Sequence, residues 1–580
     1  MGHDNLYESV LPARGRRTAF LPALAFLWLV ISSAAGEPSR SFQVRYHCEP
    51  SIGRGDPSPP GGPRLGRELP YHTLRILLPP GSGVDSYRAT PSVPSDPCPL
   101  PPISLPRPGP SLVSRVRRGT TPAALELVSV QHLAGWPVVV FRLFPWRDGK
   151  GEAVFVSDWT VTVATRASGS VESDLLAASG AAAVRERLVA IVDNPGLLPQ
   201  EPAQVLEGRC DYLVVTRAAL AGAFEPLLVA KRRSGWVAEV LTLESLPAGV
   251  PGRDVAERLR DRIHGEYVRR GLRWVLLGGD TSVVPTRMAY LPRGGTPAEC
   301  LVPADLYFGC LDGSWNRDGN NQWGEPTDGE DGGDVDLLPE VDVGRAPVRT
   351  PEEVAAFVDK TLVASRVEPG SRRRALLLGS DLEHGGVARI ETFQPLRAQL
   401  GGWEVRELAD RPGSPRWTAA DAILGLNDSP SVVCFNGHGD PESAFRLGPA
   451  DLVRLANDKP FLFSSIGCEI GRFDRDAHTP PSMGERLVTL PRTGAFAAVV
   501  NARAGWFDAL EPGRYSNELQ VEFYRQLLSG RGVPLGRAVA ASKEAFLGAL
   551  EVSGSMPYRG CYLQWTLLGD PEARVGAGAE

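Results

Sequence analysis

The strongest constraint on the fold is a pair of short apolar segments, each ending in glycine beside one reactive side chain. The first covers residues 431–439 and ends around His438, and the second begins at residue 461 and reaches Cys468. Each is typical of a buried strand that delivers a side chain to the edge of a sheet. Residues 447–456 between them have helical spacing, and strand, helix, strand is the unit that places parallel strands side by side. The sequence therefore predicts that both side chains meet beyond the carboxyl ends of neighbouring strands.

A cysteine and a histidine at one sheet edge suit nucleophilic catalysis. A thiol is a poor nucleophile until it loses its proton, and an imidazole can take that proton and return it to a leaving amine. Taken singly, Cys468 is equally typical of a buried structural thiol, and His438 of a hydrogen-bonded structural histidine. Their joint placement favours the catalytic interpretation. Ser464 and Ser465 precede the same turn but lack a partner that would activate them.

These segments resemble the gingipain-type cysteine peptidases, a bacterial branch of the caspase-like fold. The resemblance is carried first by the motifs at residues 436–439 and 466–474, and it extends over roughly residues 206–575. Further segments agree in order and spacing: residues 211–216, 275–280, 338–345 and 567–571. Together they imply a caspase-like fold and peptidase activity, which no single segment would justify.

The resemblance also implies roles for individual residues. Cys468 would be the nucleophile, His438 the general base, and the backbone N–H groups of Gly439 and Cys468 an oxyanion hole. Glu340 is a candidate to orient the His438 imidazole, or else a structural carboxylate at a strand edge. In well-studied members a second cysteine directly precedes the nucleophile, whereas this chain has Gly467. That departure makes the assignment to Cys468 less ambiguous.

Length, charge and the N-terminus predict a large exported protein. A chain of 580 residues is long enough for several domains with full cores. Charged residues make up 22% and the net charge is −6, so no nucleic-acid partner is expected. Arginines, an apolar run and small residues within residues 1–35 indicate a signal peptide, with an uncleaved anchor as the alternative. No later apolar run is long enough to span a membrane, so no stable insertion is expected after signal cleavage, and the protein would be secreted, periplasmic or on the cell surface.

The chain divides into a β-rich part and an α/β part. Apolar, β-branched runs before residue 165 predict strands, and strands alternate with helices from residue 206 onward. The predicted division is: signal peptide 1–35, β-rich domain 36–165, helix-bearing linker 166–205, first α/β subdomain 206–370, caspase-like catalytic subdomain 371–580. The expected fold class is thus α/β, with a caspase-like catalytic unit of two adjacent α/β subdomains preceded by a β-rich domain. The β-rich domain is similar in position to the propeptide that keeps gingipain-type enzymes latent as zymogens; a permanent accessory domain is the alternative.

An acidic, glycine-rich stretch of the first α/β subdomain has the spacing of a calcium loop. Counting from Ser314, oxygen-bearing residues fall at positions 1, 3, 5, 7 and 9, with glycine at 6 and glutamate at 12. This is the EF-hand spacing, although no amphipathic helix precedes it. The expected ligands, with Asp312 nearby to add charge, are Ser314, Asn316, Asp318, the Asn320 carbonyl, Gln322 and Glu325. Related enzymes contain calcium, which favours a structural Ca²⁺ over the alternative of an acidic loop that binds nothing.

The best interpretation is a secreted cysteine endopeptidase that cleaves protein or peptide substrates through a thioacyl-enzyme. Two alternatives stay open: a catalytically silent calcium-binding structural or binding protein on the same fold, and a transpeptidase with the same Cys–His pair. Zinc is not expected because the eight cysteines include no CxxC pair. Two candidate disulfides are Cys48 with Cys98 and Cys300 with Cys310. The sequence does not indicate the primary specificity or the oligomeric state.

Overall fold

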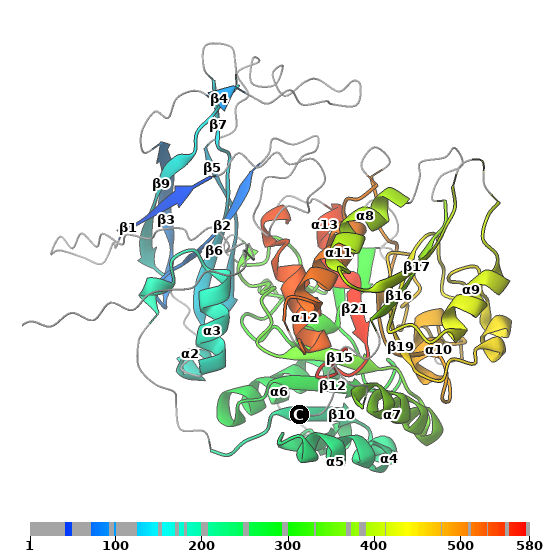
Figure 1. Cartoon of the computed structure of the whole chain (residues 1–580). Helices are drawn as coiled ribbons and strands as arrows, with labels where there is room; N and C mark the ends of the chain where they lie inside the picture. The colour runs from blue at the N-terminus through cyan, green and yellow to red at the C-terminus, as the bar shows by residue number, and fades with distance from the viewer. Residues whose placement is uncertain are drawn as a thin grey trace, which may run out of the picture.

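The structure is a computed structural model of the chain (Figure 1). It describes residues 41–48, 71–91, 98–99, 124–148, 153–168, 173–178, 182–198, 207–247, 254–292, 300–329, 332–366, 373–381, 390–411, 413, 415–476, 478–508, 512–530, 532–550 and 556–575. The expected signal peptide and the side chain of Cys98 lie outside these residues. Cys300 and Cys310 are not joined by a disulfide. Within the described ranges, no helix is long and apolar enough to cross a lipid bilayer.

The N-terminal domain is built from small antiparallel sheets, as the sequence predicts. Their orders are β1-β9-β3, β2-β6-β5 and β4-β8-β7. The strands are β1 Ser41–His47, β2 His72–Leu77, β3 Ser82–Pro91, β4 Cys98–Pro99, β5 Leu125–Leu133, β6 Trp136–Leu143, β7 Trp146–Asp148, β8 Ala153–Phe155 and β9 Asp158–Ala167. Strand β9 alternates, with Trp159, Val161 and Val163 fully buried and the residues between them partly exposed, so one face forms the core of the domain.

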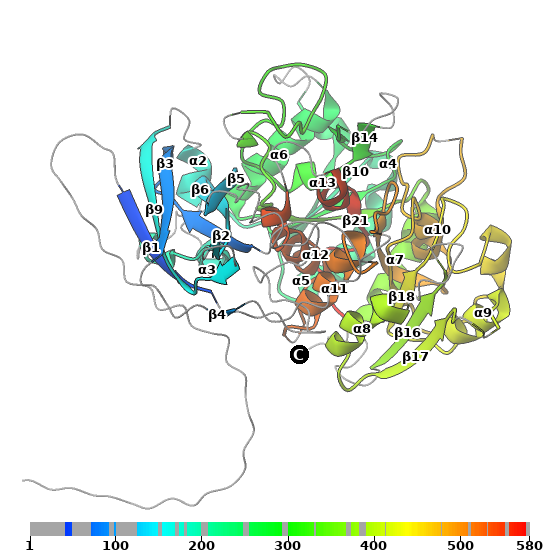
Figure 2. The same ribbon diagram turned by 90° about the horizontal axis from the view of Figure 1, so that it is seen from above.

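Strand β6 is buried on both faces because it lies between two cores. Val139 and Phe141 belong to the core of the N-terminal domain. Val138 and Val140 point the other way and join the large hydrophobic cluster of the α/β unit. Helices α2 (Ser173–Ala178) and α3 (Ala182–Ile191) follow the sheets and lie at the same junction (Figures 1 and 2). The N-terminal domain therefore shares a continuous apolar core with the α/β unit.

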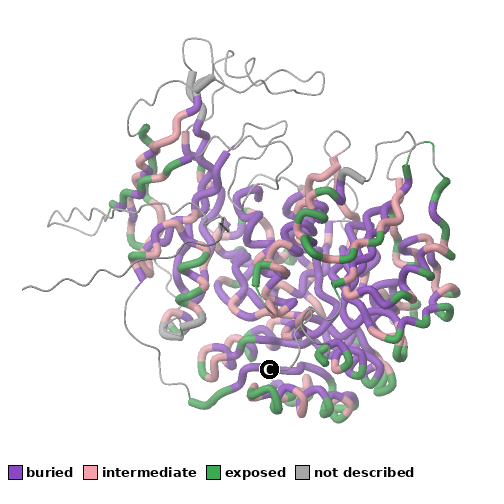
Figure 3. Tube along the Cα trace, viewed as in Figure 1, coloured by how far each residue is buried: buried purple, intermediate pink, exposed green. Residues whose placement is uncertain are grey.

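The α/β part contains one ten-stranded sheet in the described chain, with the order β11-β10-β12-β15-β21-β20-β19-β18-β16-β17. The strands are β10 Tyr212–Thr216, β11 Ala238–Thr242, β12 Trp274–Gly278, β15 Asp342–Ala346, β16 Arg374–Gly379, β17 Glu404–Ala409, β18 Val432–Asn436, β19 Phe461–Ser465, β20 Ala495–Asn501 and β21 Trp565–Leu568. A small antiparallel pair, β13 (Met288–Tyr290) and β14 (Leu301–Pro303), stands apart from it. The central strands are buried (Figure 3).

The two predicted α/β subdomains do not coincide with the two halves of this sheet, which run in opposite directions: β21, from the predicted second subdomain, runs with the strands of the first. Strands from β11 to β21 are parallel to one another, and so are those from β20 to β17. The halves meet where β20 pairs with β21 in antiparallel fashion. Strand β15 is attached to β21 through a single pairing, Arg345 with Leu568. The carboxyl ends of β18 and β19 consequently lie on the same edge as the amino end of β15.

The helices form two packed groups. One contains α4, α5, α7 and α10, and the other α8, α11, α12 and α13. The bounds are α4 Ala218–Ala221, α5 Glu225–Arg233, α6 Val255–Arg270, α7 Pro351–Ser365, α8 Ile390–Gln399, α9 Ala419–Asn427, α10 Met483–Thr489, α11 Ser516–Leu527, α12 Leu535–Glu544 and α13 Met556–Gln564. Local signals fix their ends: Asp254 caps the start of α6, and Gly271, with φ of 72°, ends it.

One local prediction needs correction. Within residues 447–456 there is only a short 3-10 helix, η7 (Pro449–Arg454), in which Leu452 is buried while Val453 is 86% exposed, so two tight turns suffice to cover the sheet. The 3-10 helix η5 (Asp305–Phe308) leads into the acidic loop. The remaining 3-10 turns are η1 Pro195–Leu197, η2 Gly222–Phe224, η3 Leu243–Ser245 and η8 Leu547–Ala549.

Candidate active site

Strands β18 and β19 are parallel neighbours and bring His438 and Cys468 to one edge of the sheet. The register pairs Val432 with Leu462 and continues to Phe435 with Ser465. His438 stands two residues beyond the end of β18, and Cys468 three residues beyond the end of β19. The structure thus places the two predicted catalytic side chains on adjacent turns at the carboxyl ends of their strands.

The two turns are in contact, and glycines make that contact possible. A Cβ placed on Gly439 would lie 3.4 Å from the carbonyl oxygen of Cys468 and only 2.6 Å from Ile470. A Cβ on Gly467 would lie 2.6 Å from the same Ile470 side chain and 3.1 Å from the carbonyl oxygen of Gly437. Ile470 therefore fills the space that a side chain at position 467 would need, and the backbone of each turn approaches the other closely.

Cys468 differs from the other cysteines whose side chains the structure describes. Its side chain is half-buried, and its Sγ lies 4.0 Å from the carbonyl oxygen of Gly505, while the others are buried. Burial raises the pKa of the Cys434 thiol to about 12 and that of the Cys561 thiol to about 12. Such thiols stay protonated and inert at neutral pH, which leaves Cys468 as the cysteine suited to nucleophilic chemistry.

The segment that follows Cys468 is fastened to the end of β20. The N–H of Glu469, a residue with φ of 54°, donates to the carbonyl oxygen of Arg503 over 2.9 Å. The Arg503 guanidinium pairs with both carboxylate oxygens of Asp474, one of them at 2.7 Å. Two-point pairing of this kind restricts orientation as well as distance. The nucleophile turn is consequently held at its far end by a neighbouring strand.

Glu340 does not lie where the resemblance implied. It precedes β15, which is four strand spacings from β18, roughly 19 Å at about 4.8 Å per spacing. One carboxylate oxygen accepts from the N–H of Ala134 at 2.9 Å, and the other from the N–H of Leu311 at 2.7 Å. The structure therefore does not support Glu340 as the group that orients His438. Its partners come from the N-terminal domain and from a distant loop.

Glu340 belongs instead to a buried group of carboxylates with Asp312 and Asp336. The turn between β5 and β6, with Ala134 and Gly135 both at positive φ, points its backbone N–H groups at this group. Gly135 donates to Asp312 over 3.3 Å. Burial, reinforced by the neighbouring carboxylates, raises the pKa of Asp336 and of Glu340 well above the ordinary values. The group anchors the N-terminal domain.

The predicted calcium loop is only partly assembled as expected. Ser314 is exposed, and its hydroxyl donates to Asp334 over 2.7 Å. The Asn320 carbonyl accepts from the side-chain amide of Asn316 over 2.7 Å, and Gln322 is exposed. Asp312 lies in the separate carboxylate group described above. Asp312 and Ser314 are therefore engaged elsewhere, whereas Asn320 joins the others: its Nδ2 donates to Asp318 at 2.8 Å and to Glu325 at 2.6 Å.

A different set of oxygens is gathered in the same loop. Asp318, Glu325 and Asp328 each offer a carboxylate oxygen within 4.8 Å of the others. Asp328 is buried, and desolvation together with Glu325 and Asp318 raises its pKa to about 7. Buried oxygens of Asp328 and Asn316 have no hydrogen-bond partner. Sequence reasoning missed Asp328 because it lies beyond the twelve-residue loop; its only signal was the acidic run after Glu325.

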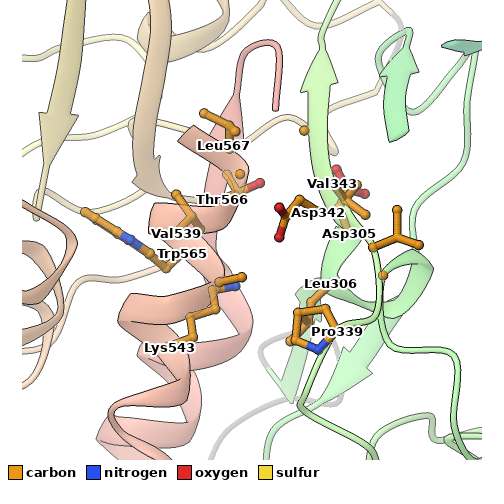
Figure 4. Close-up of a pocket in the computed structure, with 15 residues that line it drawn as sticks. Asp305, Leu306, Pro339, Asp342, Val343, Val539, Lys543, Trp565, Thr566 and Leu567 are labelled. Atoms are coloured by element: carbon orange, nitrogen blue, oxygen red, sulfur yellow. The ribbon is translucent and has the colours of Figure 1, made fainter. Parts of the chain in front are cut away.

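A small cavity of about 40 Å³ lies between β15 and β21, apart from the turns that carry His438 and Cys468 (Figure 4). Asp342 from β15 and Thr566 from β21 face it, and Lys543 from α12 closes one side. Burial lowers the pKa of Lys543 to about 7. The cavity lies between β15 and β21, and its lining does not include Cys468 or His438.

Comparison with known protein families gave a match over the α/β part of the chain. The profile of Peptidase family C25 matches residues 206–576, which is more than half of the chain. The chain belongs to peptidase family C25. It is thus a cysteine-type peptidase, as the resemblance implied, and its catalytic part has an α/β fold. The match also covers the whole ten-stranded sheet, from β10 to β21.

Solved structures similar to the C25 peptidase include the Arg-specific cysteine proteinase gingipain R (RgpB), at 18% identity and TM-score 0.49, covering 63% of this chain and 78% of that one. The complex of the Porphyromonas gingivalis RgpB pro- and mature domains is 18% identical, with a TM-score of 0.48, and the match covers 63% of this chain and 79% of that one. Dimeric latent PorU from Porphyromonas gingivalis is 16% identical, with a TM-score of 0.30, and the match covers 78% of this chain and 36% of that one. No curated protein matched the sequence significantly.

Proposed function

We propose that this protein is an endopeptidase in which Cys468 is the nucleophile and His438 the general base. The proposal is supported above all by the parallel register of β18 and β19, which puts the two side chains on adjacent, contacting turns. The burial of the other described cysteines points to the same thiol. The C25 family match supplies the reaction class.

In the proposed mechanism His438 removes the proton of the Cys468 thiol, and the thiolate attacks the carbonyl carbon of the scissile peptide bond. The N–H groups of Gly439 and Cys468 stabilise the oxyanion that forms. His438 then gives its proton to the leaving amine as the C–N bond breaks, which leaves a thioacyl-enzyme. Water, deprotonated by His438, attacks the thioester, releases the acid and restores the thiol.

Active-site labelling tests this assignment. A substrate-like chloromethyl ketone or epoxide is expected to modify Cys468, identified by mass spectrometry of the labelled peptide. Replacement of the base, His438→Ala, should slow labelling by about 100-fold or more, because general-base activation is lost. Equal labelling of both proteins, or labelling at Cys434, would contradict the proposed pair.

We also propose that the N-terminal domain is a permanent part of the enzyme rather than a removable propeptide. Strand β6 contributes to both cores, which is typical of a domain interior. Arg187 of α3 forms a buried ion pair with Glu544 of α12. Arg142 of β6 donates to the carbonyl oxygen of Gly548 over 2.8 Å. The β5–β6 turn adds its hydrogen bonds to the buried carboxylates.

Cleavage of the linker is therefore expected to leave the two parts associated. A specific protease site placed within residues 199–206, cut after folding, should give fragments that elute together in gel filtration and separate only in denaturant. Turnover of a small substrate should stay within about twofold of the uncut enzyme, because an interface of interior character does not dissociate at working concentrations. Separate elution, accompanied by a large rise in turnover, would instead support a zymogen.

Export remains part of the proposal, supported by the arginine, apolar and small-residue pattern of residues 1–35. Fractionation of cells expressing the full chain, with N-terminal sequencing of the mature protein, tests it. Cleavage near residue 35 is the expected result.

The Ser314–Glu325 region is proposed to hold one structural Ca²⁺, through Asp318, Glu325 and Asp328 with the side-chain oxygen of Asn316. All four groups are oxygen ligands, which suits a hard cation, and two of them have buried oxygens without hydrogen-bond partners. A divalent cation would also offset the repulsion that raises the pKa of Asp328.

Removal of calcium is expected to lower the melting temperature. A cation that binds the native state alone stabilises it by about 2.7 kcal/mol at a hundredfold excess over Kd. Asp328→Asn should abolish the effect of a chelator, measured by thermal unfolding with and without EGTA. Because Asp328 must lose its proton to bind the cation, the affinity should fall as the pH drops below about 7.

The matched control is Asp312→Asn, which changes a carboxylate that the sequence suggested as a ligand but that lies in the other group. Its melting temperature should still respond to EGTA. An equal response of the Asp328→Asn protein, or no response of the wild type, would leave the loop as a surface feature that binds nothing.

A further inference from the structure

The peptide group just before the nucleophile turn forms hydrogen bonds to buried side chains through both its carbonyl oxygen and its N–H. This group joins Ile466 to Gly467. Its carbonyl oxygen accepts a hydrogen bond from Nδ2 of Asn501 at 3.0 Å, and its N–H donates to Oγ of Ser465, also at 3.0 Å. Ser465 and Asn501 are both fully buried. Ser465 belongs to β19 and Asn501 to β20, so hydrogen bonds from two strands fix the plane of this peptide.

Ser465 also ties this turn to the strand that precedes His438. Its hydroxyl donates to the carbonyl oxygen of Phe435, the last paired residue of β18, at 2.9 Å. The same oxygen accepts the N–H of Ile466 at 3.3 Å. The single hydroxyl thus acts once as donor and once as acceptor. It couples the position of one catalytic turn to that of the other.

Tight packing prevents water from replacing the hydrogen bond that Asn501 donates to the Ile466 carbonyl oxygen. A Cβ placed on Gly505 would lie 2.1 Å from the Ile466 carbonyl oxygen and 3.0 Å from Nδ2 of Asn501. The backbone of Gly505, whose carbonyl lies near the Cys468 thiol, therefore covers this hydrogen bond from outside. Loss of the Asn501 amide would leave a buried carbonyl oxygen without a donor.

We propose that Ser465 and Asn501 are positioning residues for Cys468, an inference that rests on the proposed role of Cys468 as the nucleophile. With the preceding peptide plane fixed, only the backbone angles of Gly467 and Cys468 decide where the thiol and the Cys468 N–H point. Gly467 would otherwise rotate readily, because glycine has the widest conformational range. Donors and nucleophiles act strongly only when held in place before the reaction, and a misplacement of about 1 Å costs roughly 100-fold in rate.

The neighbouring residues provide a matched control. Ser464 is as buried as Ser465, but its hydroxyl pairs with the hydroxyl of Tyr524 at 2.8 Å and accepts from the Gln520 amide at 3.2 Å. Gln520, like Asn501, is fully buried and has a side-chain oxygen without a partner. Ser464 and Gln520 thus match Ser465 and Asn501 in chemistry and burial, but they connect β19 to α11 instead of to the catalytic turn.

The experiment compares Ser465→Ala and Asn501→Ala with Ser464→Ala and Gln520→Ala in the full-length enzyme. For each protein, kcat is measured per active site titrated with an irreversible thiol reagent, together with KM and the melting temperature. The first two variants are expected to lose roughly 10- to 100-fold in kcat with KM within about threefold. The control variants should keep kcat within about threefold of the wild type, although their melting temperatures fall by about as much as those of Ser465→Ala and Asn501→Ala. Ser465→Thr, which keeps the hydroxyl, should restore most of the lost kcat.

Equal kcat values in the two sets of variants would overturn the inference, as would a loss that follows the melting temperature in all four. If the Ser465→Ala protein does not fold, Asn501→Ala carries the same comparison with Gln520→Ala. Failure of the proposed function gives a different result, because Cys468→Ala would then stay active. An inactive Cys468→Ala enzyme beside a fully active Ser465→Ala enzyme rejects only the positioning role.

Discussion

Cys468→Ala is expected to abolish peptide hydrolysis, with a fall in kcat/KM of roughly 10⁴-fold or more, while the protein stays folded. Without the sulfur no thioacyl-enzyme forms, so the remaining groups only stabilise direct attack by water. The side chain is half-buried beside Gly505 and is not part of the core, so its loss should change the free energy of unfolding by about 1 kcal/mol or less. Hydrolysis of a peptide library and thermal unfolding measure the two quantities.

Cys434→Ala is the control. Cys434 lies fully buried on β18, and its pKa is raised to about 12 by burial, so it cannot serve as the nucleophile at neutral pH. Its replacement leaves a small cavity and should lower stability by about 1 kcal/mol, with kcat/KM within a few-fold of wild type. A peptidase that loses activity through Cys434 and keeps it in Cys468→Ala would require a different active site.

The central strands and the catalytic turns could be predicted from sequence because their signals are local. Short apolar runs lie in β18 and β19, each strand is followed closely by a glycine, and no distant residue is needed to recognise them. The ends of α6 are set by equally local residues, Asp254 and Gly271. Helical spacing over residues 447–456 was misleading, since a six-residue 3-10 helix satisfies the burial of Leu452.

What could not be predicted depends on contacts between remote segments. The partner of Glu340 is Ala134, 206 residues earlier, and nothing in either segment indicates the pairing. Ser465 looked partnerless because its hydrogen bonds go to backbone groups of β18 and of its own turn. Asn501, at the end of the next strand, reaches the same turn only because β20 pairs with β19. A sequence shows which residues are chemically capable, and the sheet order decides which of them meet.

The largest loss of stability is expected from Asp305→Asn, which should lower the free energy of unfolding by about 3–5 kcal/mol. Arg345 is fully buried in β15, and its guanidinium donates to both carboxylate oxygens of Asp305, at 2.6 and 2.7 Å. Replacing the carboxylate with an amide leaves a buried positive charge without its counter-charge, and this is far costlier than losing the attraction alone. Chemical denaturation at neutral pH gives the value.

The same substitution should also affect the catalytic half of the sheet. Arg345 is the residue through which β15 pairs with β21, and its guanidinium lies 4.9 Å from the ring centre of Phe473, five residues after Cys468. Activity of Asp305→Asn should therefore fall at a lower temperature than that of the wild type. The control is Glu404→Gln at the sheet edge, where the ion pair with Arg374 is 3.0 Å long but largely exposed, so its loss should cost no more than about 1 kcal/mol. Similar small losses in both variants would mean that the Arg345 charge has a second counter-charge, and the junction of β15 with β21 would then owe its stability to apolar packing.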